Sequence, residues 1–158
     1  MPPLIDNYSA QSIPVSSSQT VHEIFIDRRQ SSTSVIIVDS DEYNLINGKI
    51  LGLLNQYSTL QHNWDEDGAR APWPATIQSA KSITLLLSKH GQAIFHTAPG
   101  PNGEIMLDLR SKSKTKSLEI ILYPNKTVAV LFPEQGSPSQ QKFNTSNLPE
   151  LLNWLNQK

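Results

Sequence analysis

The sequence contains no cysteine, which excludes disulfide bonds, thiol nucleophiles and thiolate metal ligands. An excess of one charge sign is also missing, because 13 Lys and Arg side chains stand against 14 Asp and Glu, for a formal net charge of −1. Nucleic-acid-binding proteins usually carry a basic excess, so the total charge argues against that class and leaves only a local basic patch open. Long apolar runs are lacking too: VIIV at 35–38 is far shorter than the roughly 20 residues that cross a bilayer.

The first residues, MPPLIDNYSA, lack the basic start and the apolar stretch of a secretory signal, so we expect a cytoplasmic protein. Uncharged polar residues are abundant, and eight of the 19 serines lie within residues 1–34. This composition predicts a flexible serine-rich arm over residues 1–34. VHEIFID (21–27) and TSVIIVD (33–39) could add a hairpin or loose edge strands. Residues 35–158 are expected to form a single domain with a two-layer core.

Three segments space their apolar residues as amphipathic helices do. The first follows Ser40, a good N-cap; the second starts at Pro74, which suits a first helical turn, and ends before Gly91. The third lies within SNLPELLNWLNQ near the end of the sequence. The expected buried positions are Ile46, Ile50, Leu53, Leu54 and Tyr57 in the first helix, Trp73, Ile77, Ala80, Thr84 and Leu87 in the second, and Leu148, Leu151, Leu152 and Leu155 in the third.

Four segments between the second and third helices are predicted to be strands: 93–97, 104–110, 117–123 and 127–132. Short turns such as APGPNG and PNK join them, which favours an antiparallel sheet, and PEQGSPSQQ is expected to be a loop. Alternation assigns to the buried face Ile105, Leu107, Leu109, Leu118, Ile120, Leu122, Val128, Val130 and Phe132. The predicted fold is therefore a two-layer α+β domain, a four-stranded antiparallel sheet covered by two or three helices.

The corner between the first two helices, NWDEDGARAPWP (63–74), is rich in acids, tryptophan and proline. Its start resembles a calcium-binding EF-hand loop, but the glycine follows the second acid directly and position 12 from Asp65 is a threonine. A structural corner is favoured, in which Asp65 accepts backbone N–H groups in an Asx turn and Gly68 supplies a positive φ. The remaining role is partner binding, by Trp64, Asp65, Asp67, Arg70 and Trp73.

The same corner resembles a segment in a group of uncharacterised small bacterial proteins, in which NWDGxGA, a proline and I..A precede a PDGGI.LEW-type strand. The resemblance covers about Leu60 to Leu131. Its matching residues here are Asn63, Trp64, Asp65, Gly68, Ala69, Pro74, Ile77, Ala80, Pro101, Asn102, Gly103, Ile105 and Leu107, followed by LEIILYPNKTV. Departures are Glu66, where the group often has glycine, and Asp108-Leu109, where it often has Glu-Trp. The resemblance implies that the corner and the PNG turn form one unit, and it implies no activity.

The segment RSKSKTKS places a cation at every second residue, namely Arg110, Lys112, Lys114 and Lys116. In an extended ribbon these side chains would share one face and could grip phosphates, which makes nucleic-acid binding an alternative function. No aromatic residue interleaves with them to stack on bases. A solvated hairpin whose lysines discourage edge pairing is therefore favoured.

Enzymatic signatures are missing, since the sequence has no G-x-S-x-G elbow, P-loop, G-x-G-x-x-G turn or H-E-x-x-H helix. A zinc site could be drawn from His62, Asp65 and His90, but their spacing matches no usual ligand pair. We therefore expect no metal and no cofactor, and a non-enzymatic protein is favoured. A small metal-dependent hydrolase that uses the 62–67 loop stays open as an alternative.

The leading hypothesis is a protein-interaction module, an accessory, antitoxin-like or immunity-like partner of another protein. It depends on the small size, the near-neutral charge, the lack of motifs and an N-terminal arm that could fold on a partner. Trp154 lies beside the leucine stripe of the third helix, where it is either an anchor for a partner or part of the core. Nucleic acid is the less favoured partner, and no membrane is expected.

Overall fold

The computed structural model describes residues 40–158, with side chains from residue 44 onward. The serine-rich arm expected over residues 1–34, and the strands expected at 21–27 and 33–39, lie outside the described residues. The division of the chain at residue 34 therefore stays a prediction. None of the helices within 40–158 is long and apolar enough to cross a membrane.

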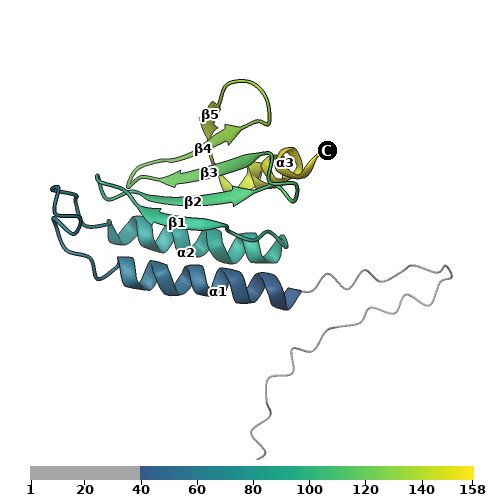
Figure 1. Ribbon diagram of the computed structural model, residues 1–158. Coiled ribbons are helices and arrows are strands. Elements are labelled where there is room, and N and C mark those ends of the chain that lie inside the picture. Colours follow the sequence, from purple (N-terminus) through teal and green to yellow (C-terminus); the bar gives the residue numbers. More distant parts are fainter. Residues whose placement is uncertain (1–39) are drawn as a thin grey trace, which may run out of the picture. The chain divides into compact units, whose positions relative to one another are not determined.

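Two long helices form one layer of the described domain (Figure 1). They are α1 (Ser40–Tyr57) and α2 (Pro74–Lys89), which lie side by side and antiparallel because the corner between them reverses the chain. Helix α2 begins with proline in its first turn and ends where Gly91 adopts a φ of 64°, a left-handed conformation that costs glycine little. A single 3₁₀ turn (Thr145–Asn147) leads into α3 (Leu148–Asn156), and Asn144 and Asn147 form a reciprocal capping box there.

The second layer is a five-stranded antiparallel sheet in which neighbours in sequence are neighbours in space. Its strands are β1 (His96–Pro99), β2 (Ile105–Arg110), β3 (Ser117–Leu122), β4 (Thr127–Phe132) and β5 (Ser139–Lys142). The α+β class is confirmed, but the sheet has one strand more than the predicted four. The sequence SQQK of β5 carries no apolar pattern, and all four of its side chains are exposed. It is a strand only because its backbone pairs with β4, and side-chain periodicity cannot report that pairing.

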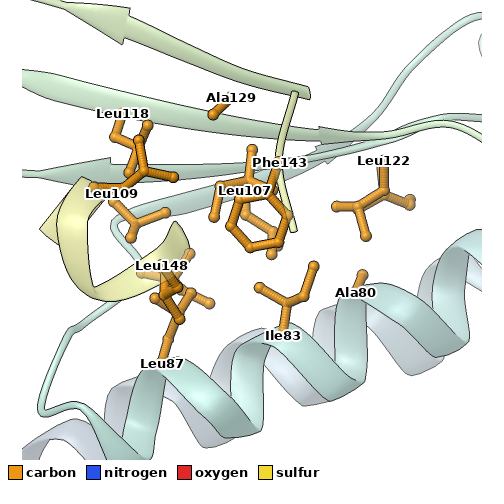
Figure 2. Close-up of a cluster of buried hydrophobic side chains, with 14 of the residues drawn as sticks. Ala80, Ile83, Leu87, Leu107, Leu109, Leu118, Leu122, Ala129, Phe143 and Leu148 are labelled. Carbon is orange, nitrogen blue, oxygen red and sulfur yellow. The ribbon is translucent and has the colours of Figure 1, made fainter. Parts of the chain in front are cut away.

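The core lies between the helices and one face of the sheet, and Figure 2 shows part of it. The buried leucine and isoleucine positions predicted for β2 and β3 are confirmed, and helices α1, α2 and α3 all contribute side chains to the same cluster. Phe143, just after β5, is 5% exposed and also reaches this cluster. In Figure 2 it lies between the sheet and Ile83 of α2.

The face predicted for β4 is wrong by one residue. Ala129 pairs with Ile120, and Leu131 with Leu118, so these two β4 residues are the ones that face the core. Val128, Val130 and Phe132 lie on the opposite face. Val128 is nevertheless only 7% exposed, so its predicted burial is confirmed although it points away from the core cluster. The sequence TVAVLF is apolar on both faces, so alternation alone cannot choose between them. The β3–β4 turn sets the register by pairing Leu122 with Thr127, and this register decides which β4 residues face the core.

Candidate functional site

The side of the sheet that points away from the helices carries a row of apolar residues among polar ones. Met106 lies opposite Ile121, which in turn lies opposite Val128, so one apolar row runs across three strands. Val130 and Phe132 extend this row along β4. We call this surface the open face; it comprises Met106, Asp108, Glu119, Ile121, Val128, Val130 and Phe132, of which Asp108 and Val128 are buried and the others half-buried. Polar residues border it on the same side of the sheet, namely Arg110, Ser117, Gln140 and Lys142. The described helices join the core on the other side, and none of them covers the open face (Figure 1).

Two carboxylates lie side by side in the middle of the open face. Asp108 of β2 is directly opposite Glu119 of β3, at a cross-strand position where side chains of like charge repel. Arg110 compensates one of them, because its Nη2 lies 3.1 Å from Oδ2 of Asp108. No salt bridge to Glu119 is found within the described residues. Partial burial raises the pKa of Glu119, and the neighbouring Asp108 carboxylate raises it further.

Arg110 is held in place by a second contact. Its guanidinium group stacks 3.7 Å from the centroid of the Phe95 ring, while both Nε and Nη2 donate hydrogen bonds to Asp108. Phe95 is 55% exposed, so this stacking occurs at the surface. The arginine is therefore committed to partners within its own sheet and is not free to reach a distant phosphate.

The basic segment after Arg110 is the solvated turn of the β2–β3 hairpin, as favoured from the sequence, and does not form the extended ribbon of the alternative. Residues 112–115 form a turn, in which the N–H of Lys114 donates to the carbonyl of Ser111 and Lys114 adopts a φ of 60°. Lys116 is used elsewhere, because its Nζ donates to the carbonyls of Trp154 and Gln157 at the end of α3. Such a cation also interacts favourably with the negative end of the helix dipole. Of the four predicted phosphate ligands, only Lys112 and Lys114 are exposed and outside these contacts.

Trp154 itself packs against the core cluster as a half-buried side chain. The Nζ of Lys116 lies 5.6 Å from the centre of its ring, so the indole has the lysine on one side. These packing contacts alone are enough to explain a tryptophan at position 154. Its use as an anchor for a partner stays a prediction.

The corner holds itself together by local hydrogen bonds. Oδ1 of Asp65 accepts the N–H groups of Asp67 and Ala69, at 3.0 and 2.9 Å, which is the predicted Asx turn. The bond from Ala69 is the main reason that the pKa of Asp65 lies below the usual aspartate range. Gly68 has a φ of 92°, as expected, and Glu66 also adopts a positive φ, of 66°. Glycine adopts that conformation more readily, and position 66 is where the resembling group often has it.

The two tryptophans of the corner differ in what they touch. Trp64 is half-buried, and its Nε1 donates to the carbonyl of Arg70 within the corner. Trp73 was expected to be buried with the second helix, but it is the extended residue before α2 and is 38% exposed. Its Nε1 donates to the carbonyl of Asn102. The guanidinium of Arg70 lies 5.0 Å from the Trp73 ring. The side chains of Arg70 and Trp73 line a small cleft of about 330 Å³, together with His62 and the neighbouring prolines.

The corner is also fastened to the β1–β2 turn, as the resemblance implied. The N–H of Arg70 donates to the carbonyl of Pro101, and the N–H of Trp73 to that of Gly103. Of the six predicted partner-binding residues, the structure gathers Trp64, Asp65, Asp67, Arg70 and Trp73 in this corner, and Trp154 lies apart from them in α3. The close fit between corner and turn accounts for most of their contacts without a partner.

No metal centre is evident in the part of the chain that the structure describes. Within residues 44–158, no three His, Asp or Glu side chains come together as a metal site would require. Nδ1 of His62 already accepts the N–H of Ala71 at 3.2 Å. His90 lies at the far end of α2 from the corner, so the set of His62, Asp65 and His90 is not assembled.

The open face was not predicted from the sequence. Its signal was present, because β3 and β4 carry apolar residues on both faces where a sheet covered on one side usually alternates with polar ones. Asn47 was missed as well. It is 1% exposed, and its side chain ties α1 to Ser88, Gln92 and Ile94 at the end of α2. A lone asparagine within a helix gives no sequence signal for such a role.

Comparison of the chain with protein-family models, with curated proteins and with solved structures finds no match.

Proposed function

We propose that this chain is a protein-interaction module whose open face binds an amphipathic segment of a protein partner. The supporting observation is an apolar sheet face, uncovered by the described helices, with an acidic side chain at its centre. Contiguous apolar surface of this kind is rare on monomeric proteins and commonly marks an interface. The proposal refines the expected accessory, antitoxin-like or immunity-like role, and a cytoplasmic location belongs to the same proposal.

The charge of the open face specifies the chemistry of the partner. Glu119 sits in partly apolar surroundings beside Asp108, and its charged form is disfavoured there. A lysine or arginine of the partner would relieve this repulsion in an environment that binding makes drier. A second copy of the chain fits less well, because a two-fold contact centred on Glu119 would bring two such carboxylates together. We therefore expect apolar partner side chains around one central cation.

Site-specific crosslinking in the cells of origin tests where the partner binds. A photoreactive amino acid in place of Ile121, on the open face, is expected to trap one protein. The same amino acid in place of Leu85, which is 53% exposed on α2, serves as the control and should trap none. Equal crosslinking at both positions would show that capture is unspecific and would contradict the proposal, as would no crosslink at Ile121.

Binding of the purified partner then tests the chemistry. Ile121→Lys and Glu119→Lys are each expected to weaken binding by at least about tenfold. The first places a charge in the apolar row, and the second replaces the carboxylate that would pair with the partner's cation by a group that repels it. Leu85→Lys adds the same charge to the surface of α2 and should leave affinity within about twofold of the wild type. Equal weakening by Leu85→Lys would contradict the site, and trapping of the chain by itself would replace the proposed partner with a dimer.

A further inference from the structure

A separate hollow lies at the end of the domain where α2 meets the β2–β3 turn. It has a volume of about 760 Å³ and is lined by the segment 90–95, by the segment 110–114 and by side chains of α1 and α3. Binding sites for small molecules usually have volumes between about 300 and 1,000 Å³. The hollow is also distinct from the corner and shares only Arg110 and Phe95 with the surroundings of the open face.

The lining of this hollow has two chemical parts. Arg110, Lys112 and Lys114 supply positive charge from the β2–β3 turn, and none of the described residues that line the hollow is acidic. Ile46, Ala93, Ile94, Phe95 and Leu152 supply apolar walls. Asp108 compensates Arg110, so the two exposed lysines are the cations left to meet a ligand. Two polar side chains of the lining already bond to each other, because Nδ2 of Asn156 donates to Oε1 of Gln92 at 3.1 Å.

We propose that this hollow binds a small organic anion, a carboxylate or phosphate ester with an apolar body. The lysines would meet the anionic group at the rim, and the apolar walls would receive the rest of the molecule. A nucleic-acid strand fits less well, because Arg110 and Lys116 are held by contacts within the domain. The two remaining lysines could contact only a few phosphates of a strand.

Nuclear magnetic resonance of the ¹⁵N-labelled full chain, with phenyl phosphate as the probe, tests the proposal. Phenyl phosphate is expected to shift the amide signals of segments 90–95 and 110–114, with an effect that weakens as salt increases. Benzyl alcohol, which has a similar body without the charge, should bind at least about fivefold more weakly. Equal affinity of the two probes, or shifts spread over lysines elsewhere, would overturn the proposal.

A pair of double variants separates the site from general positive charge. Lys112→Ser with Lys114→Asn should weaken phenyl phosphate binding by about fivefold, and asparagine tolerates the left-handed conformation at position 114. Lys126→Ser with Lys142→Ser removes the same charge elsewhere and should leave affinity unchanged. If both variants weaken binding alike, the hollow is not the site. If a single-stranded oligonucleotide binds more tightly than phenyl phosphate and shifts only the turn 112–115, nucleic acid replaces the small anion.

Discussion

Replacing Gly103 with alanine tests how tightly the corner and the β1–β2 turn are joined. Gly103 adopts a φ of 85°, where an L-residue pays about 1–2 kcal/mol of backbone strain. A Cβ there would also lie 2.6 Å from Cδ1 of Trp73 and 2.8 Å from the carbonyl oxygen of Ala71. Both distances are shorter than real contacts allow, so the corner must shift.

The expected cost follows from adding these effects. Overpacking of this kind costs about 1–3 kcal/mol. The indole of Trp73 cannot rotate away freely, since its Nε1 donates to Asn102 and Arg70 stacks against its ring. Alanine also restricts the unfolded chain, which offsets about 0.4–1 kcal/mol. We therefore expect Gly103→Ala to lower the free energy of unfolding by about 2–4 kcal/mol.

Gly68→Ala is the matched control. Gly68 has a similar φ of 92°, but nothing lies within 4 Å of its added Cβ, so only the backbone strain remains. Its cost should be about 1 kcal/mol, and the difference between the two variants measures the contact with Trp73 and Ala71. Urea denaturation followed by tryptophan fluorescence gives both values, provided that the dependence on urea is unchanged. A Gly103→Ala cost within about 0.5 kcal/mol of the control would refute the close fit.

Three further substitutions test other parts of the domain. Asn47→Ala removes buried hydrogen bonds between α1 and the end of α2 and should cost about 2–4 kcal/mol in urea denaturation, whereas Asn55→Ala, exposed on the same helix, should cost little. In Gly48→Ala, the added Cβ meets open space within α1, so the free energy of unfolding should rise by about 0.5–1 kcal/mol. A lower free energy of unfolding would show that the helix does not continue through position 48. The pKa of Glu119 is raised in the folded state, so the folded protein holds this proton more tightly than the unfolded chain does. The free energy of unfolding therefore falls as the pH rises from the usual glutamate pKa through the raised one. Glu119→Gln should remove that decline and be the more stable protein at neutral pH; a stability–pH curve parallel to that of the wild type would contradict this.

The helices and strands β2, β3 and β4 were predictable because each carries a strong periodic signal over several residues. The first strand was expected at 93–97 but lies at His96–Pro99, because this short segment has no such signal to set its bounds. Ile105, Leu107 and Leu109 alternate with more polar neighbours, and the structure buries all three. The fifth strand was not predictable, because SQQK pairs through its backbone and leaves every side chain exposed. The Asx turn of the corner could be predicted from Asp65 and Gly68. Its docking onto the β1–β2 turn is a tertiary contact that local sequence does not encode and that only the resemblance suggested.

The error in β4 and the failure to find the open face have the same physical cause. A strand that is apolar on both sides gives no preferred orientation, so the face assigned to Val128, Val130 and Phe132 was arbitrary. Apolar residues on the uncovered side of a sheet stabilise it only through contacts with their neighbours on that side, which leave Val128 7% exposed and the others half-buried. Their occurrence in three adjacent strands, around the central Glu119, calls for a reason beyond this mutual packing. A partner that covers this face supplies that reason, and it would also make the sequence pattern of β4 consistent, since both of its faces would then be buried.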